Sequence, residues 1–488
     1  MLDYLTFTNL ALFAIALLLF YIWLTPKYKN LPPGPMGVPF LGCLPFMETL
    51  AERTFTKWSK KYGPIITVQL GDHRTVILNS YEAIEEAFTK KGEKFNGRFK
   101  TYFTEFASEG LGIFFIDGEK WKEHRKFGTR ALAGAGMYGK TIEQRVLEEA
   151  ENICHVIRSK NEEPFILEDY LILSVANVIN GITIKERCDE EGNENLLKYV
   201  ASVVEGICLL LFVYVQTQKH MKSMKDGLRM GNGKVTSFVR YFMVIFLAAL
   251  FDNLIEQHQQ QHDRLHPRDL IDLYLNEMKD FSKPQLRYFL KDLFAAGTET
   301  SSSTIRWALF YLIVNPDIQD KVHKEIDDVI ETGHNGVVRY DTKLPYTKAV
   351  LQETYRIRTA TPLGVPRRNT EDVTLMGYFI PKNTQIIPNL WWVHNDPEYW
   401  NEPDVFKPER HLDEEGNLIM SNRVIPFSIG ARHCLGENLA RTEIFLFLVS
   451  ILQKFTVLPN PEDPNPPLEC SPGIVNSPHK YPLIIVPI

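Results

Sequence analysis

One cysteine of this sequence lies in a segment suited to hold a reactive thiolate. The segment is Phe427-Ser428-Ile429-Gly430-Ala431-Arg432-His433-Cys434-Leu435-Gly436, and apolar residues predict a helix from about Leu435 to Gln453. Glycines allow a tight loop and a close approach of backbone. Backbone amides and the amino end of a helix stabilise a negative sulfur. The spacing Phe-x-x-Gly-x-x-x-Cys-x-Gly therefore favours a metal-binding thiolate over an inert buried thiol.

A single thiolate restricts the kind of metal that this segment can bind. The other cysteines of the six are scattered, and none has a second cysteine or a histidine at the spacing of a zinc site. One sulfur cannot complete a tetrahedral site, so the metal must bring its own equatorial ligands. This reasoning points to haem iron with Cys434 as its axial ligand.

A second chemical feature lies at the centre of a long predicted helix. Ser282-Lys283-Pro284-Gln285 is typical of a helix start, and the next helix breaker is Asn315-Pro316. The central residues Ala296-Gly297-Thr298-Glu299-Thr300-Ser301 favour helix poorly, because glycine costs about 1 kcal/mol and hydroxyls compete for backbone carbonyls. A weak centre between strong flanks indicates either a site or close packing against another backbone.

The remaining patterns predict a mainly α protein with small β-sheets that position these residues. Helical spacing covers residues 142–159, 196–216, 267–278 and 319–330. Alternation over residues 64–80 predicts a hairpin that turns at Gly71-Asp72, and residues 373–387 predict a second hairpin around Pro381-Lys382-Asn383. No flexible linker interrupts residues 47–488, so we expect one large catalytic domain there.

The amino terminus predicts a membrane anchor. Residues 4–25 contain no charged side chain and are long enough to cross a bilayer as a helix. Lys27 and Lys29 follow, and the positive-inside rule places the rest of the chain in the cytosol. We therefore expect an anchor at residues 1–26 and a stiff, proline-rich linker at residues 27–46.

Charge excludes one class of partner and indicates another. With 54 Lys+Arg and 60 Asp+Glu the net charge is −6, which argues against a nucleic-acid binder that depends on bulk charge. Residues 219–240 nevertheless hold six cations and one acid, and the uncharged residues 241–251 are too short to span a bilayer. These residues predict either a flap that rests on anionic membrane lipid or a buried helix preceded by a solvated loop.

Over essentially its whole length the sequence resembles the cytochrome P450 family, and specifically the membrane-bound animal microsomal members of family 2. Four motifs occur in family order: the proline-rich arm at residues 32–35, the helix centre at residues 296–301, Glu353-Thr354-Tyr355-Arg356, and the Cys434 loop. The resemblance implies the cytochrome P450 fold with an N-terminal transmembrane helix. It also implies haem b (iron protoporphyrin IX) and insertion of one atom of O2 into a lipophilic substrate, which could be a steroid, a fatty acid or a xenobiotic.

The resemblance also implies roles for individual residues. Thr300 is expected to hold oxygen and a proton-delivering water, and Glu299 to relay protons. Haem binding is expected of Arg98, Trp121, Arg125, Arg367, Phe427, Arg432 and Cys434, and Cys434 is the expected iron ligand. The arginines would neutralise the buried propionates of haem. The substrate pocket is expected to use Ile113, Phe114, Ala296, Leu363, Val365 and Ile474, an apolar set.

Two substitutions distinguish the sequence from the usual family pattern. Arg367 stands where related members commonly have histidine, so a permanent charge replaces a titratable one. His411 follows the arginine of Pro408-Glu409-Arg410, where the family usually has phenylalanine, so the packing there is expected to differ. Glu353 and Arg356 lie on one helical face, and in the family they pair with that arginine; an exposed helical ion pair is the alternative that spacing leaves open.

No residues remain for flavin domains, so a separate partner must supply the electrons. The resemblance implies NADPH-cytochrome P450 reductase, with cytochrome b5 as a further candidate, and a location in the endoplasmic reticulum membrane with a single pass. The cations around Trp121 are either part of a docking face or a solvated helix surface: Lys120, Lys122, Arg125, Lys126 and Arg130. Two other functions stay open, a haem-thiolate isomerase or lyase, which does not need Glu299 and Thr300, and a haem-based gas sensor.

Overall fold

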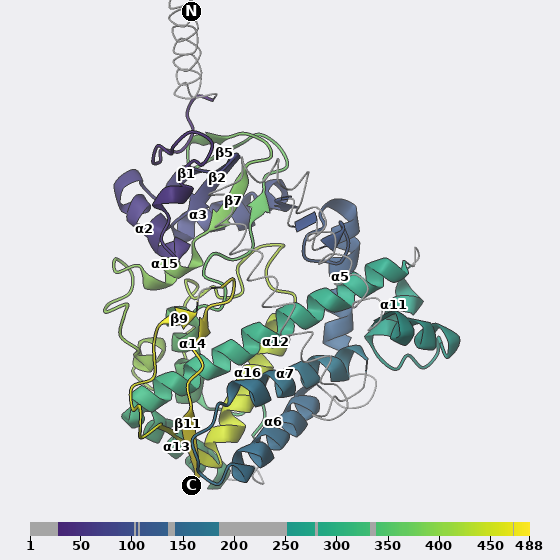
Figure 1. The fold of residues 1–488 in the computed structure, drawn as a ribbon, viewed down its shortest axis with the longest axis vertical. Coiled ribbons are helices and arrows are strands. Elements are labelled where there is room, and N and C mark those ends of the chain that lie inside the picture. The colour runs from purple at the N-terminus through teal and green to yellow at the C-terminus, as the bar shows by residue number, and fades with distance from the viewer. Residues whose placement is uncertain are drawn as a thin grey trace, which may run out of the picture.

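The computed structural model describes residues 28–101, 104–105, 108–134, 142–184, 251–278, 282–331, 338–471 and 473–488. The described chain is mainly α with small β-sheets, as predicted, and the main sheet lies toward the amino-terminal end of the molecule (Figure 1). Among the described residues no helix is both long and apolar enough to cross a membrane. The predicted anchor at residues 1–26, the helix at residues 196–216 and the stretch at residues 219–250 lie outside the described residues.

The helices account for most of the regular structure. They are α2 (Ala51–Tyr62), α3 (Tyr81–Glu85), α5 (Gly118–Gly134), α6 (Ile142–Ser159), α7 (Glu168–Thr183), α11 (Leu270–Glu277), α12 (Lys283–Val314), α13 (Pro316–Glu331), α14 (Pro345–Ile357), α15 (Leu390–Asn395) and α16 (Glu437–Leu452). Residues 251–260 are also helical, and shorter helical turns are η1 (Leu44–Phe46), η2 (Glu86–Lys90), η3 (Gly92–Phe95) and η6 (Pro408–His411). The helices predicted at residues 142–159 and 319–330 are thus confirmed. The helix predicted at Pro267 begins later, at Leu270, because the carboxylate of Asp269 caps it by accepting the backbone N–H groups of Ile271 and Asp272.

The long central helix, α12, has the predicted bounds. Ser282 is its N-cap and accepts the backbone N–H of Gln285, and the helix ends before Asn315. It crosses the helical part of the molecule and packs against α7, α14 and α16 (Figure 1). A Cβ at Gly297 would lie 2.7 Å from Cδ1 of Ile179 in α7. Close packing therefore explains this glycine, although the neighbour is a side chain and not a backbone.

The main sheet has the strand order β1-β2-β7-β4-β3. Its strands are β1 (Ile65–Leu70), β2 (His73–Leu78), β3 (Gly97–Arg98), β4 (Arg367–Arg368) and β7 (Gln385–Pro388). The predicted first hairpin is confirmed, because β1 and β2 pair antiparallel around a turn in which Gly71 has a φ of 62°. β7 lies parallel to β2 and antiparallel to β4.

The predicted second hairpin is wrong in its turn and its partner strands. β5 (Val373–Leu375) pairs with β6 (Tyr378–Ile380) around Met376 and Gly377, which both have positive φ. Two-residue hairpin turns favour positive φ at their central positions. The residues around Pro381 instead link β6 to β7, which joins the main sheet.

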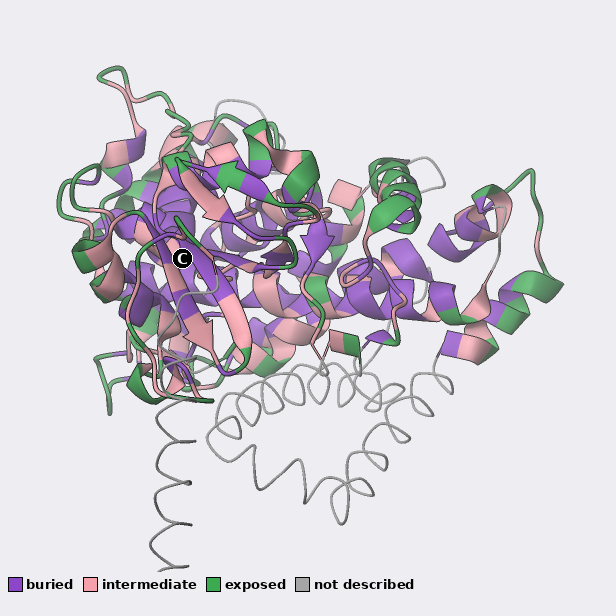
Figure 2. Cartoon of the chain, turned by 90° about the horizontal axis from the view of Figure 1, so that it is seen from above, coloured by how far each residue is buried: buried purple, intermediate pink, exposed green. Residues whose placement is uncertain are grey.

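The carboxyl-terminal chain forms two small sheets. β8 (Phe455–Pro459) pairs with β11 (Leu483–Pro487), and β9 (Cys470–Ser471) pairs with β10 (Ser477–Pro478). β10 contacts α12. Buried residues gather along the inner faces of the helices and of the main sheet (Figure 2). The buried side chains of α12 belong to the core formed by the helices.

The proline-rich residues at the start of the described chain lie against β1. The backbone N–H of Thr67 donates to the carbonyl oxygen of Pro33 at 2.9 Å, and that of Cys43 donates to Gln69 at 2.6 Å. A Cβ at Gly34 would lie 1.8 Å from the carbonyl oxygen of Thr67. These contacts fix the direction in which the chain leaves the sheet toward its amino terminus.

Candidate active site

The Cys434 loop is a compact turn at the amino end of α16. The backbone N–H of Cys434 donates to the carbonyl oxygen of Phe427 at 2.9 Å, and that of His433 donates to Gly430 at 3.0 Å. Gly430 has a φ of 77°, and a Cβ there would lie 1.9 Å from the carbonyl oxygen of Phe88. Only glycine fits this position, so the motif's glycine is required by both conformation and space.

The Cys434 thiol is exposed although it lies deep in the protein. Cys43 and Cys154 are buried, whereas Cys434 is exposed. Burial raises the pKa of the Cys434 thiol, and a hydrogen bond from the backbone N–H of Gly436 opposes that effect. A metal cation bound at this accessible sulfur would hold it as a thiolate.

Arg367 and Arg432 lie beside this loop, and each has an unsatisfied N–H group. Arg367 donates from Nη2 to the carbonyl oxygen of Ile429 at 2.9 Å, and Arg432 donates from Nη2 to that of Ile116 at 2.8 Å. In both side chains Nη1 is buried and has no partner among the described residues. The guanidinium of Arg432 lies 3.7 Å from the ring centroid of Trp121, which is also buried. A buried donor without an acceptor is costly, so both arginines are placed to receive an acceptor from outside the chain.

Arg98 links these arginines to the expected substrate pocket. It is buried, and it donates from Nε to the carbonyl oxygen of Phe114 at 2.8 Å and from Nη1 to that of Val365 at 3.3 Å. Phe114 and Val365 are both expected to contact substrate, and they lie far apart in sequence. Hydrogen bonds from Arg98 to their backbones hold them next to each other.

The arginines of the cluster repel one another. Burial, together with Arg98 and Arg367, lowers the pKa of Arg432 to about 8, although Asp117 raises it. Burial and Arg125 lower the pKa of Arg98 to about 10. Asp117 is already paired at 2.5 Å with a further arginine of β4. The positive charge is thus compensated incompletely within the described residues, and carboxylate groups such as the propionates of haem would complete it.

Arg125 and Phe427 lie at the two sides of the Cys434 loop. Arg125 donates from Nη1 to the carbonyl oxygen of His433 at 2.8 Å. The ring centroid of Phe427 lies 5.8 Å from that of Tyr355, and the guanidinium of Arg441 lies 4.7 Å from the Phe427 centroid. Arg441 was not predicted, although its position four residues after Glu437, with which it pairs at 3.0 Å, is a recognisable helical signal.

The polar centre of α12 has the expected competition for backbone carbonyls. Thr300 donates from Oγ1 to the carbonyl oxygen of Ala296 at 2.7 Å, and Thr304 donates to that of Thr300 at 2.8 Å. Ala296 is exposed, whereas Thr304 is buried. The helix centre therefore faces an accessible space on the side of Ala296.

Glu299 is bound by hydroxyl groups from two elements. Its Oε1 accepts from Ser303 at 3.1 Å on the next turn of α12, and from Ser477 at 2.7 Å in β10. Ser477 was not predicted as a site residue. Sequence spacing gives no sign of this contact, because 178 positions separate the two residues.

Gly128 of α5 lies between the Cys434 loop and α12, and α12 also contacts α16 directly. A Cβ at Gly128 of α5 would lie 2.9 Å from Cδ2 of Leu435 and 3.2 Å from Cζ of Phe289 in α12. Ser301 forms a hydrogen bond with Glu443 of α16, and burial raises the pKa of Glu443 to about 8. An acid within the apolar stretch of α16 was a signal that sequence reasoning did not use.

The chain matches the family model for cytochrome P450 over residues 32–485. It belongs to the cytochrome P450 family. It is 36% identical over 477 residues to cytochrome P450 2C25 of Mesocricetus auratus, which covers 94% of this chain and 95% of that protein. It is 36% identical over 476 residues to cytochrome P450 2J2 of Homo sapiens, with 94% and 92% covered. It is 35% identical over 484 residues to cytochrome P450 2C5 of Oryctolagus cuniculus, with 97% of each chain covered. The predicted resemblance to family 2 is confirmed, and this cytochrome P450 is a haem monooxygenase.

The rim of the expected pocket in this P450 is fastened to α12 by Asp292. Its Oδ2 accepts the backbone N–H groups of Ile113 at 2.8 Å and Phe114 at 2.9 Å. Gly112 must be glycine, because its φ is 83° and a Cβ would lie 2.2 Å from the same carboxylate oxygen. Asp292 was not predicted, since an acid on a helix is normally read as a solvated residue.

The expected pocket residues differ in how deeply they are buried. Ile113 is buried, and Phe114 and Val365 are half-buried beside Arg98. The remaining three are Leu363, which is half-buried and packs against the sheet core, and Ala296 and Ile474, which are exposed. The structure thus gathers Phe114 and Val365 at Arg98, and it leaves Ile474 accessible between β9 and β10.

Glu353 of the P450 lies in a fully buried network and not in an exposed ion pair. Its Oε2 accepts from Nε of Arg356 at 2.8 Å and from Nε2 of His411 at 2.9 Å, and its Oε1 accepts from Nε of Arg410 at 3.0 Å. Burial alone would raise the pKa of Glu353, but the hydrogen bonds of Arg356 and His411 lower it to about 2. The unusual His411 therefore takes part in the network itself.

His394 is a second buried histidine that sequence reasoning missed. Its Nε2 accepts the backbone N–H of Ile425 at 2.8 Å, and its Nδ1 contacts the hydroxyl of Thr359, which in turn donates to Tyr355 at 2.8 Å. This network assigns the proton to Nδ1. Burial and Arg356 lower the pKa of His394 to about 3, so it stays neutral. It connects α14 and α15 to the chain just before the Cys434 loop.

The cations around Trp121 have different environments. Arg125 turns toward the Cys434 loop, Lys122 pairs with Glu119 at 2.7 Å, and Arg130 pairs with Glu277 of α11. The exposed members are Lys120, Lys122, Lys126 and Arg130. This surface of α5 is therefore basic and accessible, with some of its charge already neutralised.

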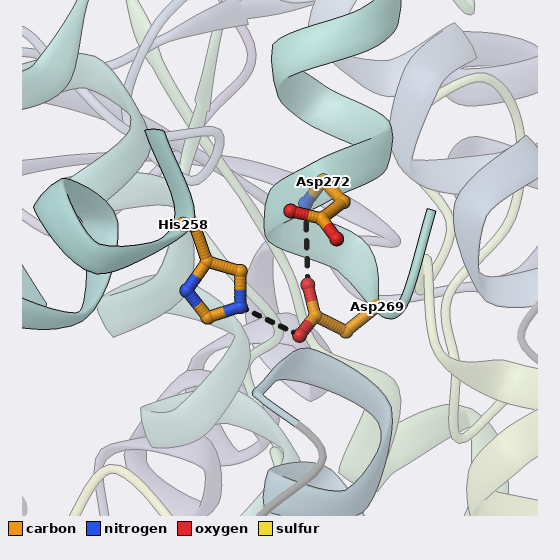
Figure 3. A group of neighbouring side chains, drawn as sticks. All are labelled: His258, Asp269 and Asp272. Carbon is orange, nitrogen blue, oxygen red and sulfur yellow. Dashed lines mark hydrogen bonds and ion pairs between the residues drawn. The ribbon is translucent and has the colours of Figure 1, made fainter. Parts of the chain in front are cut away.

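A group of titratable residues away from the site fastens α11 to the preceding helix. It consists of His258, Asp269 and Asp272, all buried (Figure 3). Nε2 of His258 donates to Oδ2 of Asp269 at 2.8 Å, and Asp272 pairs with Arg268 at 2.7 Å. Burial alone would lower the pKa of His258, but Asp269 raises it. Both carboxylates are thus engaged within the fold, and we assign the group a structural role.

Proposed function

We propose that this P450 inserts one atom of O2 into a lipophilic organic substrate, a steroid, a fatty acid or a xenobiotic, with electrons from NADPH. The reaction takes up O2, two electrons and two protons, and it releases the second oxygen atom as water. The observation that carries the proposal is the combination, at one loop, of an accessible Cys434 thiol with the unsatisfied N–H groups of Arg432, on that loop, and of Arg367, which binds the loop from β4.

The residues present fit haem b. Cys434 would hold the iron, and Arg98, Arg367 and Arg432 would hold the propionates, with Trp121 packed against Arg432. The remaining members of the proposed set are Arg125 and Phe427, which flank the same loop. Bound haem supplies the redox activation of O2. The protein contributes a buried cationic cluster whose N–H groups would donate hydrogen bonds to the propionates of the cofactor.

Thr300 and Glu299 would handle protons on the α12 side of the site. The Thr300 hydroxyl donates to a carbonyl of its own helix, so its oxygen can accept a hydrogen bond from a water. Glu299 precedes Thr300 by one residue on α12. Its Oε1 contacts two serine hydroxyls. We assign the Glu299 carboxyl group the role of taking up and releasing the proton.

The sequence supports a membrane setting for this chemistry. Residues 1–26 would anchor the chain in the endoplasmic reticulum by a single pass, residues 27–46 would link the anchor, and residues 47–488 would form the cytosolic catalytic domain. An apolar pocket suits substrates that partition into membranes. NADPH-cytochrome P450 reductase would dock on the basic surface of α5, and cytochrome b5 is a second candidate donor.

The experiment is a reduced carbon monoxide difference spectrum of the wild type, Cys434→Ala and Cys470→Ala. We expect the red-shifted thiolate band in the wild type and in Cys470→Ala, which changes a cysteine remote from the loop, and its loss in Cys434→Ala. Product formation with reductase and NADPH is then measured for a steroid, a fatty acid and a xenobiotic. Absence of the band from the wild type, or retention of it in Cys434→Ala, would overturn the ligand assignment.

A further inference from the structure

Ser303 and Glu299 of α12 form a closed triangle of polar groups with Ser477 of β10. The two shortest sides are the contacts of Ser477 with Glu299 and with Ser303, both at 2.7 Å, and Ser303 lies 3.1 Å from Glu299. Each hydroxyl has one proton to donate. Ser477 donates to Oε1 of Glu299, and Ser303 donates its one proton either to the same oxygen at 3.1 Å or to Ser477 at 2.7 Å.

A hydroxyl can also accept a proton, so the triangle suits both states of the carboxyl group. With Glu299 ionised, Ser477 donates to it. With a proton on Oε1, Glu299 donates to Ser477, and Ser477 turns its own proton toward Ser303. A methyl or apolar side chain at position 477 could do neither.

The backbone on both sides of Ser477 is fastened to α12. Trp307 donates from Nε1 to the carbonyl oxygen of Asn476 at 2.8 Å, and Arg306 donates from Nη2 to that of Pro478 at 2.9 Å. The backbone N–H of Asn476 donates to Ala360 at 2.8 Å. The hydroxyl of Ser477 is therefore held in place before any ligand binds, which lowers the entropy cost of its hydrogen bond.

The same segment also carries an expected substrate contact. Ile474 lies shortly before Ser477, between β9 and β10, and 38% of its surface is accessible. A substrate that contacts Ile474 therefore contacts the same segment that carries Ser477, the partner of Glu299.

We propose that Ser477 is a positioning residue that aims the Glu299 carboxyl group, with Ser303 as its second support, and that it raises the fraction of electrons that end in product. The proposal rests on the monooxygenase function and on the proton role of Glu299 proposed above. Its distinct content is that a residue of the carboxyl-terminal sheet, outside α12, controls proton handling at the centre of α12.

The test compares full-length Ser477→Ala, Ser477→Thr and Ser471→Ala, each with haem and reductase. Ser471 is the strand partner of Ser477 in β9 and contacts His479 instead of Glu299, so it is the matched control. Product per NADPH consumed is expected to fall about two- to tenfold in Ser477→Ala, the range of one lost hydrogen bond, with peroxide making up the difference. Ser477→Thr keeps the hydroxyl and is expected to restore the ratio, and Ser471→Ala to leave it unchanged.

A double-mutant cycle separates positioning of Glu299 from a general structural effect. If Ser477 acts through the carboxyl group, Ser477→Ala has no further effect on the ratio in a Glu299→Gln background. Additive losses, or a wild-type ratio in Ser477→Ala, would overturn the proposal. Failure of the wild type to form any product would instead refute the proposed function, and a lost carbon monoxide band in Ser477→Ala would show that the substitution acts by disrupting the haem site.

Discussion

Single buried residues of this P450 have charge states that differ from their usual ones, and the cause lies in their neighbours. Glu443 lies on α16 and is 1% exposed. The group that stabilises its charged form is the neutral hydroxyl of Ser301. Glu353 is also buried, yet cationic side chains surround it. Burial therefore leaves Glu443 as a neutral acid at neutral pH, whereas the cationic neighbours of Glu353 keep it an anion despite its burial.

Glu443→Gln is expected to stabilise the fold at neutral pH. Burial raises the pKa of Glu443 from an ordinary value of 4.5 to about 8. Between these values the folded chain holds a proton that the unfolded chain has released, so stability falls as the pH rises through this range. Glutamine keeps an acceptor for Ser301 and removes this pH dependence. Its removal raises the free energy of unfolding by up to about 3 kcal/mol at pH 7.

Unfolding in denaturant from pH 5 to pH 8 checks this expectation. The gain of Glu443→Gln over the wild type should grow with pH. Glu119→Gln changes an exposed acid on α5 and should leave the pH dependence unchanged. Parallel pH profiles of the wild type and Glu443→Gln would show that the carboxyl group does not stay protonated in the fold.

Arg367→His is expected to make haem retention depend on pH. The wild type keeps a permanent positive charge whose Nη1 has no partner among the described residues, whereas histidine loses its charge as the pH rises through its pKa. The variant should bind haem well at pH 6 and about tenfold more weakly at pH 8, the effect of one lost charge-assisted hydrogen bond. Transfer of haem to an acceptor protein measures this, with Arg368→His, a neighbour paired with Asp117, as control. Equal retention at both pH values would contradict a propionate contact at position 367.

At the scale of elements, the sequence was informative wherever one local signal determines the outcome. Ser282 and Asn315 bound α12 because capping and helix breaking are local effects. The turn at Gly71 followed from a glycine with positive φ between two alternating stretches. The predicted second hairpin was wrong because Met376 and Gly377, and not the residues around Pro381, form its turn, and the strand that follows pairs with β2, far away in sequence.

Contacts between distant elements could not be predicted in the same way. The Cys434 motif was recognisable because its residues are adjacent, but Asp292, His394 and Ser477 act on partners that lie 31 to 179 positions away. An isolated acid, histidine or serine has a solvated surface position as its most common state. Only the fold shows that α12 serves as a support for the loop at residues 112–114.

Asp292→Ala is expected to loosen that loop and to weaken substrate binding. The substitution leaves the backbone N–H groups of Ile113 and Phe114 without their acceptor, which costs about 1 to 3 kcal/mol. Asp292→Asn retains an oxygen acceptor and should recover most of the loss. The substrate-induced spectral shift gives the dissociation constant, which should rise about fivefold or more in the alanine variant alone. Equal binding by the alanine variant and the wild type would refute a role of Asp292 in shaping the pocket.

At the scale of the whole molecule, the Glu353 network joins segments that surround the Cys434 loop. Arg356 donates to the carbonyl oxygens of His394 at 2.7 Å and Pro403 at 2.8 Å, and Arg410 donates to that of Asn401 at 2.7 Å. One buried carboxylate thereby orients two arginines that hold α15 and the chain that follows it. Loss of that anion would leave buried cations unpaired, which costs about 3 to 5 kcal/mol.

The acid stability of the whole molecule should therefore depend on His411. The hydrogen bonds of Arg356 and His411 lower the pKa of Glu353 from 4.5 to about 2, so the network contributes stability that is present above pH 4.5 and lost as the pH falls toward 2. His411→Phe installs the usual family residue and removes one donor, so its acid unfolding midpoint should lie at higher pH than that of the wild type. At pH 7 we expect it to be less stable by about 1 to 3 kcal/mol. Because Glu443 makes stability fall from pH 4.5 toward 8, these two acids together predict a maximum near pH 5. The loss caused by His411→Phe should be constant above about pH 4.5 and should shrink as the pH falls toward 2. A loss that keeps the same size down to pH 2 would show that His411 acts through packing and not through Glu353.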